Sequence, residues 1–92
     1  MEKVRPVLVL TRDAVRGQRT RVTVAPITST KWGLATEIAV GAENGLDHSS
    51  VVNCDNISTI AVADLGRQIG FLRDDQEPDL AEAIIAAFDL DT

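Results

Sequence analysis

The chain has very few of the side chains from which most catalytic sites are built. Its 92 residues include one cysteine, one histidine, one tryptophan and no tyrosine. A single cysteine excludes an internal disulfide and fits a reducing compartment. One cysteine and one histidine cannot complete a zinc site, and no acidic cluster has the spacing of a calcium loop. The sequence therefore predicts neither a metal ion nor another cofactor.

Long apolar runs and phosphate-binding motifs are also missing. No apolar stretch approaches the roughly 20 residues that cross a membrane, and the N-terminus carries no hydrophobic signal-peptide core. There is no glycine-rich phosphate loop. A chain of 92 residues with 45% apolar composition is sufficient for one small core. We therefore expect a single soluble domain over residues 1–92, located in the cytoplasm and without a membrane partner.

The single histidine and cysteine have ordinary structural explanations. His48 lies among turn-forming residues, so we expect an exposed loop side chain rather than a member of a catalytic triad. Cys54 lies within an apolar run and is expected to be a small core residue.

The net charge of −5 is unevenly divided along the chain. Residues 1–31 carry seven basic and two acidic side chains, a net charge of +5. Residues 32–92 carry two basic and twelve acidic side chains, a net charge of −10. A basic region on an acidic protein suits a polyanionic ligand or an acidic peptide. A solvated, charged loop between strands is an equal alternative.

Short runs rich in Val, Ile and Thr predict a mainly β fold. The first run, residues 6–11, is nearly continuous in apolar residues and is expected to lie centrally in its sheet. Pro26 indicates a sheet edge or a bulge, and Gly70 a close approach or a bulge. The predicted strands are residues 6–11, 20–28, 36–40, 51–54, 57–60 and 68–72.

One clear helix is predicted, over residues 78–88. Pro78 suits a first helical turn, and Asp74 and Asp75 are candidate caps. Apolar residues then recur with helical spacing and should pack on the sheet. That stripe consists of Leu80, Ile84 and Phe88, with Ala81, Ile85 and Ala87 beside it. The predicted architecture is a small, mostly antiparallel, barrel-like sheet with a C-terminal helix.

The functional groups that remain for catalysis or binding are those of arginine, of the hydroxyl residues and of the amide residues. The planar guanidinium of Arg5 suits phosphate oxygens, and Thr28 provides a hydroxyl at a strand end. Trp32 has two interpretations: a core plug, which is favoured, or a platform on which a base stacks. The residues expected to bind RNA are Lys3, Ser29, Thr30, Lys31, Trp32, Asn53, Asp55 and Asn56.

Five motifs occur in an order that resembles the MazF/PemK family of toxin endoribonucleases. They are VRPVLVL at 4–10, VAPITST at 24–30, ENGL at 43–46, SVVNCDNI at 50–57 and LGRQIG at 65–70. The resemblance covers roughly residues 4–90. The first two motifs and their spacing are fairly specific, and the others support them.

The resemblance implies a fold, an activity and two catalytic residues. The family has a small SH3-like (CcdB/PemK-like) barrel with a C-terminal helix and works as a homodimer. It cleaves single-stranded RNA at short sequences, which inhibits translation and growth, and a cognate antitoxin protein inhibits it. Its catalytic arginine corresponds to Arg5 and its catalytic threonine to Thr28. The expected product carries a 2′,3′-cyclic phosphate, and the general base is unassigned.

The chain departs from the family pattern at two places. Members usually begin with an extra strand and a loop that borders the RNA site, whereas this sequence starts at Met1, just before the first motif. We therefore expect that strand to be absent. Ser49 stands where the family often has an aspartate. Two alternative functions stay open: a catalytically weak or dead paralogue that binds antitoxin, and a gyrase-poisoning toxin on the same fold.

Overall fold

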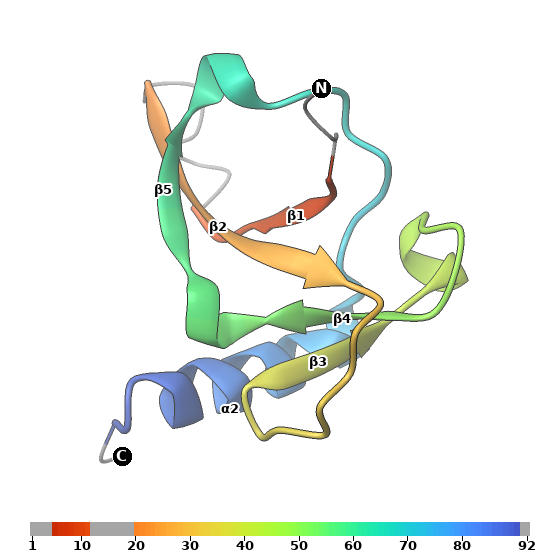
Figure 1. The fold of residues 1–92 in the computed structure, drawn as a ribbon, viewed down its shortest axis with the longest axis vertical. Helices are drawn as coiled ribbons and strands as arrows, with labels where there is room; N and C mark the ends of the chain where they lie inside the picture. Colours follow the sequence, from red (N-terminus) through yellow and green to blue (C-terminus); the bar gives the residue numbers. More distant parts are fainter. Residues whose placement is uncertain (1–4, 12–19, 91–92) are drawn as a thin grey trace.

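The structure, a computed structural model, describes residues 5–11 and 20–90 and is mainly antiparallel β (Figure 1). Its strands are β1 (Val7–Val9), β2 (Arg21–Thr28), β3 (Glu37–Val40), β4 (Ser50–Asn53) and β5 (Ser58–Ala61). Helix α2 (Glu77–Ala87) is the α-helix of the described part. Short 3₁₀ turns lie at Ala42–Asn44, Cys54–Asn56, Val62–Asp64 and Asp74–Gln76. The predicted mainly β fold with a C-terminal helix is confirmed.

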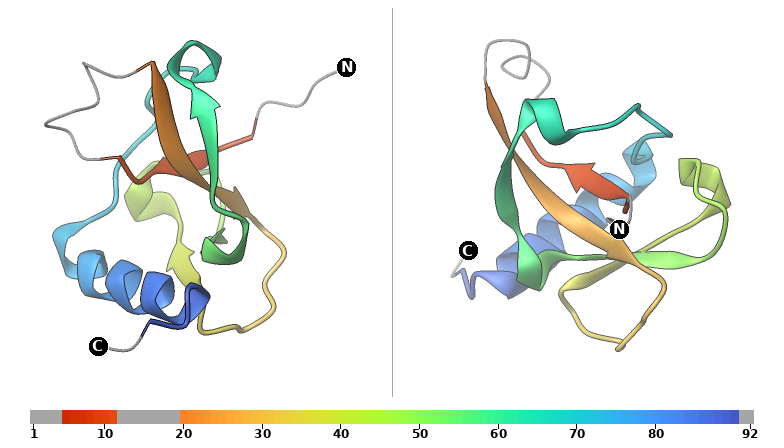
Figure 2. Two further views of the ribbon diagram at one scale, coloured as in Figure 1. Left: turned by 90° about the vertical axis from the view of Figure 1, so that its left-hand side faces the viewer. Right: turned by 45° about the horizontal axis from the view of Figure 1, so that its top comes forward.

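Strand β2 joins the two halves of the sheet. Residues 21–24 pair with β5 and residues 24–26 pair with β1. Beyond them, Ile27 and Thr28 pair with β4, which in turn pairs with β3. Figures 1 and 2 show β2 running diagonally from the β1–β5 half to the β3–β4 half. Elements from both halves therefore meet at the C-terminal end of β2.

Pro26 sits where β2 changes partners. Successive backbone N–H groups of a strand point to opposite sides, and that of Ile27 points to β1, where it donates to the carbonyl of Pro6. An N–H at residue 26 would face the other side of β2. On that side, pairing with β5 ends at Val24 and pairing with β4 begins at Ile27. Proline lacks this donor and costs nothing at such an interruption. The prediction of a sheet edge is wrong, because β2 has partners on both sides and Pro26 lies at a gap between two of them.

Helix α2 lies against β3 and the 3₁₀ turn Cys54–Asn56 and closes the hydrophobic core (Figure 1). Ile38 and Val40 are buried while Ala39 between them is exposed, as alternation along a half-buried strand requires. The predicted burial of Cys54 is confirmed. The core cluster consists of Ala25, Ile38, Val40, Val52, Cys54 and Ala83.

Two predictions about packing are wrong. Strand β1 lies at the end of the strand order, not at its centre, and its residues are only half-buried. Phe88, expected on the packed stripe of the helix, is 57% exposed because the helix ends at Ala87 and Phe88 is its C-cap. The most buried helical residue is Ala83, whose small side chain lets the helix approach the sheet closely.

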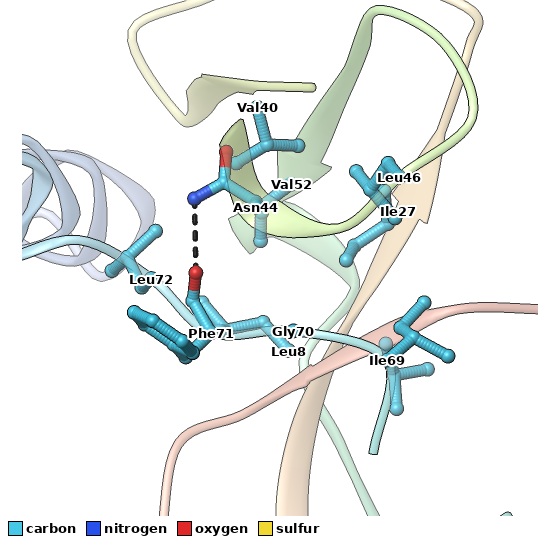
Figure 3. A pocket seen from close by; sticks show the side chains of 11 residues that line it. Leu8, Ile27, Val40, Asn44, Leu46, Val52, Ile69, Gly70, Phe71 and Leu72 are labelled. Atoms are coloured by element: carbon cyan, nitrogen blue, oxygen red, sulfur yellow. Dashed lines mark hydrogen bonds between the residues drawn. The ribbon is translucent and has the colours of Figure 1, made fainter. Parts of the chain in front are cut away.

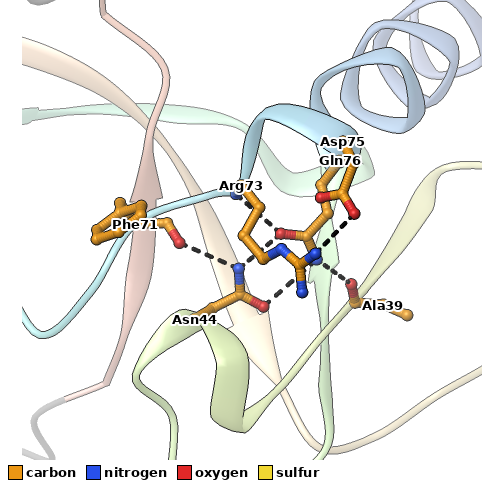
Figure 4. A network of polar contacts seen from close by, with 6 residues as sticks. All are labelled: Ala39, Asn44, Phe71, Arg73, Asp75 and Gln76. Carbon is orange, nitrogen blue, oxygen red and sulfur yellow. Dashed lines mark hydrogen bonds and ion pairs between the residues drawn. The ribbon is translucent and has the colours of Figure 1, made fainter.

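The predicted strand at 68–72 is also wrong, because side chains rather than a ladder hold this segment. Asn44 donates through Nδ2 to the carbonyl of Phe71 at 3.0 Å and to Oε1 of Gln76 at 2.7 Å (Figure 4). Gln76 donates to the carbonyl of Ala39 at 3.2 Å. The expected close approach at Gly70 is present, since a Cβ there would lie 1.8 Å from the Asn44 carbonyl oxygen.

Candidate active site

The pairing of β1 with β2 ends close in sequence to the two predicted catalytic residues, Arg5 and Thr28. Strands β1 and β2 pair Val7 with Pro26, and the N–H of Ile27 donates to the carbonyl of Pro6 at 3.1 Å. Arg5 immediately precedes Pro6 in the chain, and Thr28 immediately follows Ile27. Arg5 and Thr28 therefore flank the last hydrogen bond between these two segments.

The hydroxyl of Thr28 is oriented by the turn that follows it. Its Oγ1 accepts a hydrogen bond from the backbone N–H of Thr30 at 3.2 Å. Accepting this bond leaves the hydroxyl proton for an external acceptor. Thr28 is half-buried and Arg5 is exposed. Because Ile27 packs against the core, alternation points Thr28 to the other face of the strand.

The loop of residues 29–36 extends this site from the end of β2 to the start of β3 (Figure 1). Ser29, Thr30 and Lys31 are all exposed. Lys31 reaches back through Nζ to donate a hydrogen bond to Oγ of Ser49. Residues of this loop that were predicted to bind RNA therefore form one continuous surface with Thr28.

Trp32 is 72% exposed, so its favoured interpretation as a core plug is wrong. The loop is held by polar contacts instead of apolar packing. The carboxylate of Glu37 accepts hydrogen bonds from the backbone N–H groups of Trp32, Gly33 and Leu34. Sequence reasoning missed Glu37. The sequence pattern that could have indicated its role is an acidic residue at the start of a strand, a few residues after a glycine in the preceding loop.

The three predicted base-reading residues lie toward the other end of β4. On β4, Asn53 pairs with Glu37 and Val51 pairs with Thr28. Two residues along a strand separate Asn53 from Val51 by about 7 Å. The side chain of Asn53 accepts from the N–H of Asp55 at 2.9 Å.

The loop provides a second connection between this group and Thr28, besides β4. Asp55 accepts a hydrogen bond from the hydroxyl of Thr36, at the end of the loop, at 2.6 Å. Asn56 is exposed on the same 3₁₀ turn. Lys3, the remaining predicted RNA-binding residue, lies outside the described residues.

The two other reactive side chains, His48 and Cys54, differ in their exposure. His48 is exposed, as predicted. Burial raises the pKa of the Cys54 thiol, and the nearby charge of Asp55 raises it further. Within residues 5–11 and 20–90, no group of three or more His, Cys, Asp or Glu side chains is arranged to hold a metal ion. None of the helices in that part is both long and apolar enough to span a membrane.

An apolar pocket flanks the strands that carry the site (Figure 3). Its walls come from β1, β2, β3, β4 and the segments around Asn44 and Phe71. Asn44 is its one polar side chain, and that side chain is engaged with the Phe71 carbonyl. The pocket offers apolar contact but no acid, base or nucleophile. It is lined by Val7, Leu8, Ile27, Val40, Asn44, Leu46, Val52, Ile69, Gly70, Phe71 and Leu72.

Comparison with known proteins identifies the family. Residues 1–88 match the family described as PemK-like, MazF-like toxin of type II toxin-antitoxin system. The chain belongs to this family. The MazF/PemK-type chain is 65% identical over 91 residues to endoribonuclease MazF3 of Mycobacterium tuberculosis, covering 99% of the chain and 88% of that protein. The predicted resemblance is confirmed.

Solved structures agree with this membership. The Mycobacterium tuberculosis toxin MazF-mt6 superposes with a TM-score of 0.95 at 64% identity, over 100% of this chain and 93% of that one. A mycobacterial endoribonuclease solved in complex with its cognate antitoxin superposes with a TM-score of 0.84 at 25% identity, over 96% and 84% of the two chains. The fold of this MazF/PemK-type chain is therefore that of MazF toxins.

Proposed function

We propose that this chain cleaves single-stranded RNA with Arg5 and Thr28 as its catalytic residues, and that the substrate's own 2′-hydroxyl is the nucleophile. The observation that supports the proposal is the hydrogen bond from the N–H of Ile27 to the carbonyl of Pro6, because Thr28 follows Ile27 and Arg5 precedes Pro6 in the chain. The general role of an endoribonuclease toxin is confirmed over both alternatives by the family and by the names of its relatives.

The proposed reaction is an internal transesterification. The 2′-oxygen forms a bond to the adjacent phosphorus while the bond from phosphorus to the 5′-oxygen breaks. The 2′-hydroxyl loses its proton and the departing 5′-oxygen gains one. The products carry a 2′,3′-cyclic phosphate and a 5′-hydroxyl, and the atoms balance without water or an added reagent.

Arg5 and Thr28 have different roles in this step. Negative charge grows on the phosphate oxygens as the fifth bond to phosphorus forms. A positioned cation stabilises charge most where it develops, and an arginine stays protonated near neutral pH, so Arg5 serves as the electrostatic stabiliser. Thr28 donates its hydroxyl proton to a phosphate oxygen or hydrogen-bonds the 2′-hydroxyl. Neither residue is assigned as the general base.

The surrounding surface suits an RNA strand on either side of the cleaved phosphate. Ser29, Thr30 and Lys31 are exposed next to Thr28 and provide hydroxyl and cationic contacts to the backbone. Asn56 is exposed near the end of the loop and offers amide groups to base edges. The acidic C-terminal part of the chain repels RNA, so the strand follows the basic N-terminal part.

Cleavage of a single-stranded RNA by purified Arg5→Ala tests the proposal. Loss of one stabilising contact typically reduces the rate by about 10²–10³-fold. The matched control is Arg67→Ala, which removes an exposed arginine from the acidic part of the chain and should retain normal cleavage. Both variants should melt at the temperature of the wild type. Full activity of Arg5→Ala would contradict the proposal.

Two partners complete the proposed function. The chain forms a homodimer in the cytoplasm, and a cognate antitoxin covers the basic region from Arg5 to Lys31 with an acidic segment that orders on binding. A relative has been solved in complex with its antitoxin, which supports the second partner. Light scattering at micromolar concentration should give the mass of a dimer. Unchanged RNA cleavage by a toxin saturated with antitoxin would exclude this binding mode.

A further inference from the structure

The loop between β2 and β3 is organised around one carboxylate. Glu37 Oε1 accepts from the N–H groups of Gly33 at 2.9 Å and Leu34 at 3.2 Å, and Oε2 accepts from Trp32 at 3.1 Å. Three successive N–H groups converge in this way because Gly33 adopts φ +71°, which glycine reaches without strain. A carboxylate with three charge-assisted bonds is a strong internal anchor.

Both ends of the loop are also fixed. At its start, Lys31 donates to the hydroxyl of Ser49, on the segment that leads into β4. At its end, the hydroxyl of Thr36 donates to Asp55 at 2.6 Å, and the carbonyl of Thr36 accepts from the N–H of Cys54 at 3.0 Å. The backbone conformation around Trp32 is therefore set before any ligand binds.

A fixed loop that exposes a tryptophan has the form of a stacking platform. Trp32 remains 72% exposed, so its apolar ring stays in water, although burying such a ring is strongly favourable. Preorganisation means that a ligand gains this contact without paying to order the loop. Lys31 lies next to it in sequence and supplies the cation that a nucleic acid backbone requires.

We propose that Trp32 forms a preformed stacking subsite for one unpaired RNA base, and that Glu37 is the positioning residue that holds it. The inference rests on the proposed RNA cleavage, because Trp32 lies four residues after Thr28 on a loop continuous with it. That continuity and the adjacent Lys31 favour a nucleotide over a protein partner. Stacking depends on the π-face of the base, so this subsite contributes affinity and a graded preference among bases.

Intrinsic fluorescence isolates this contact from catalysis. Trp32 is the chain's one tryptophan and there is no tyrosine, so the tryptophan emission reports on one side chain. The probe is a short, mixed-sequence, single-stranded 2′-O-methyl RNA, which binds but has no free 2′-hydroxyl to attack. Stacking should quench the emission, and the same oligonucleotide annealed into a duplex should not. Unchanged emission at saturating probe would overturn the inference.

Substitutions at both residues test the relation between them. Trp32→Ala should weaken binding of the probe by roughly 5- to 150-fold, the range measured for loss of one stacked base, and Trp32→Phe should retain most of the affinity. Glu37→Ala should raise KM while kcat at saturating RNA stays near that of the wild type. In the Trp32→Ala background, Glu37→Ala should have little further effect, because a positioning residue acts through the side chain it positions.

The results separate this inference from the proposed function. A wild-type protein that does not cut RNA would defeat the proposed function, whereas normal binding by Trp32→Ala in an active enzyme would defeat the subsite alone. Fully additive effects of the two substitutions, or a fall of kcat in Glu37→Ala, would show that Glu37 is merely structural. An emission blue shift that depends on protein concentration without RNA would place Trp32 in a contact between copies and overturn the inference.

Discussion

Ile27 donates a backbone hydrogen bond to the carbonyl oxygen of Pro6 across 3.1 Å. Pro6 has no N–H to return, so this single bond ends the β1–β2 ladder on that side. Arg5 immediately precedes Pro6, and Thr28 immediately follows Ile27. The proline of the first motif thus closes the β1–β2 ladder, and the proposed catalytic residues lie on either side of this closing bond.

The hydroxyl of Thr28, rather than its shape, should carry its contribution. Thr28→Val keeps the branched side chain in β2 but removes the donor, so cleavage should fall by about 10²–10³-fold. Thr28→Ser keeps the hydroxyl and should retain most activity. Single-turnover cleavage of the same RNA measures both variants. Equal activity in Thr28→Val and the wild type would remove Thr28 from the catalytic pair.

Gly70 should be one of the least replaceable residues of the fold. A Cβ at this position would lie 1.8 Å from the carbonyl oxygen of Asn44, so Gly70→Ala must displace backbone. The expected loss is about 3 kcal/mol of unfolding free energy, at the upper end of overpacking costs. Gly66→Ala is the matched control because nothing lies within 4 Å of its added Cβ. Urea denaturation measures both, and equal stability would show that the close approach is absent.

Cys54 should be protected from thiol reagents and should make stability depend on pH. Its raised pKa keeps the native thiol protonated where the unfolded thiol, with a pKa of about 8.5, ionises. As the pH rises above about 8.5, the unfolded state binds fewer protons than the native state, so the free energy of unfolding falls.

Labelling and urea titrations measure these two effects of Cys54. Native protein should react slowly with a thiol reagent, and urea-unfolded protein rapidly. Cys54→Ala should lose the part of the alkaline destabilisation that Cys54 causes. Native labelling at the rate of a free thiol would contradict the burial of this side chain.

Elements with a strong local pattern were predicted well from the sequence. The alternation of Ile38 and Val40 fixes the buried face of β3, and helical spacing with Pro78 in the first turn fixes α2 to within one residue at each end. Arg5 and Thr28 were predicted both from the ends of two strands and from the family resemblance, and their catalytic roles stay a prediction.

The misses depend on contacts that are distant in sequence. Residues 68–72 have the composition of a strand. Side chains bond the backbone here instead: Asn44 donates to the carbonyl of Phe71, and Gln76 accepts from the N–H of Arg73. Trp32 is apolar and was expected inside, yet its loop is held by Glu37 and does not need its burial. The hydrogen bonds of Asn44, Gln76 and Glu37 leave no periodic signal in the sequence, because each joins a single side chain to irregular backbone.

The most direct test of the catalytic account uses an RNA with a single 2′-deoxy nucleotide at the cleaved position. Without that 2′-hydroxyl no cyclic phosphate can form, so cleavage at that bond should cease while binding persists, and the all-ribose RNA should yield a 2′,3′-cyclic phosphate and a 5′-hydroxyl. Cleavage of the substituted bond at the normal rate would contradict the account, because the nucleophile would then come from elsewhere.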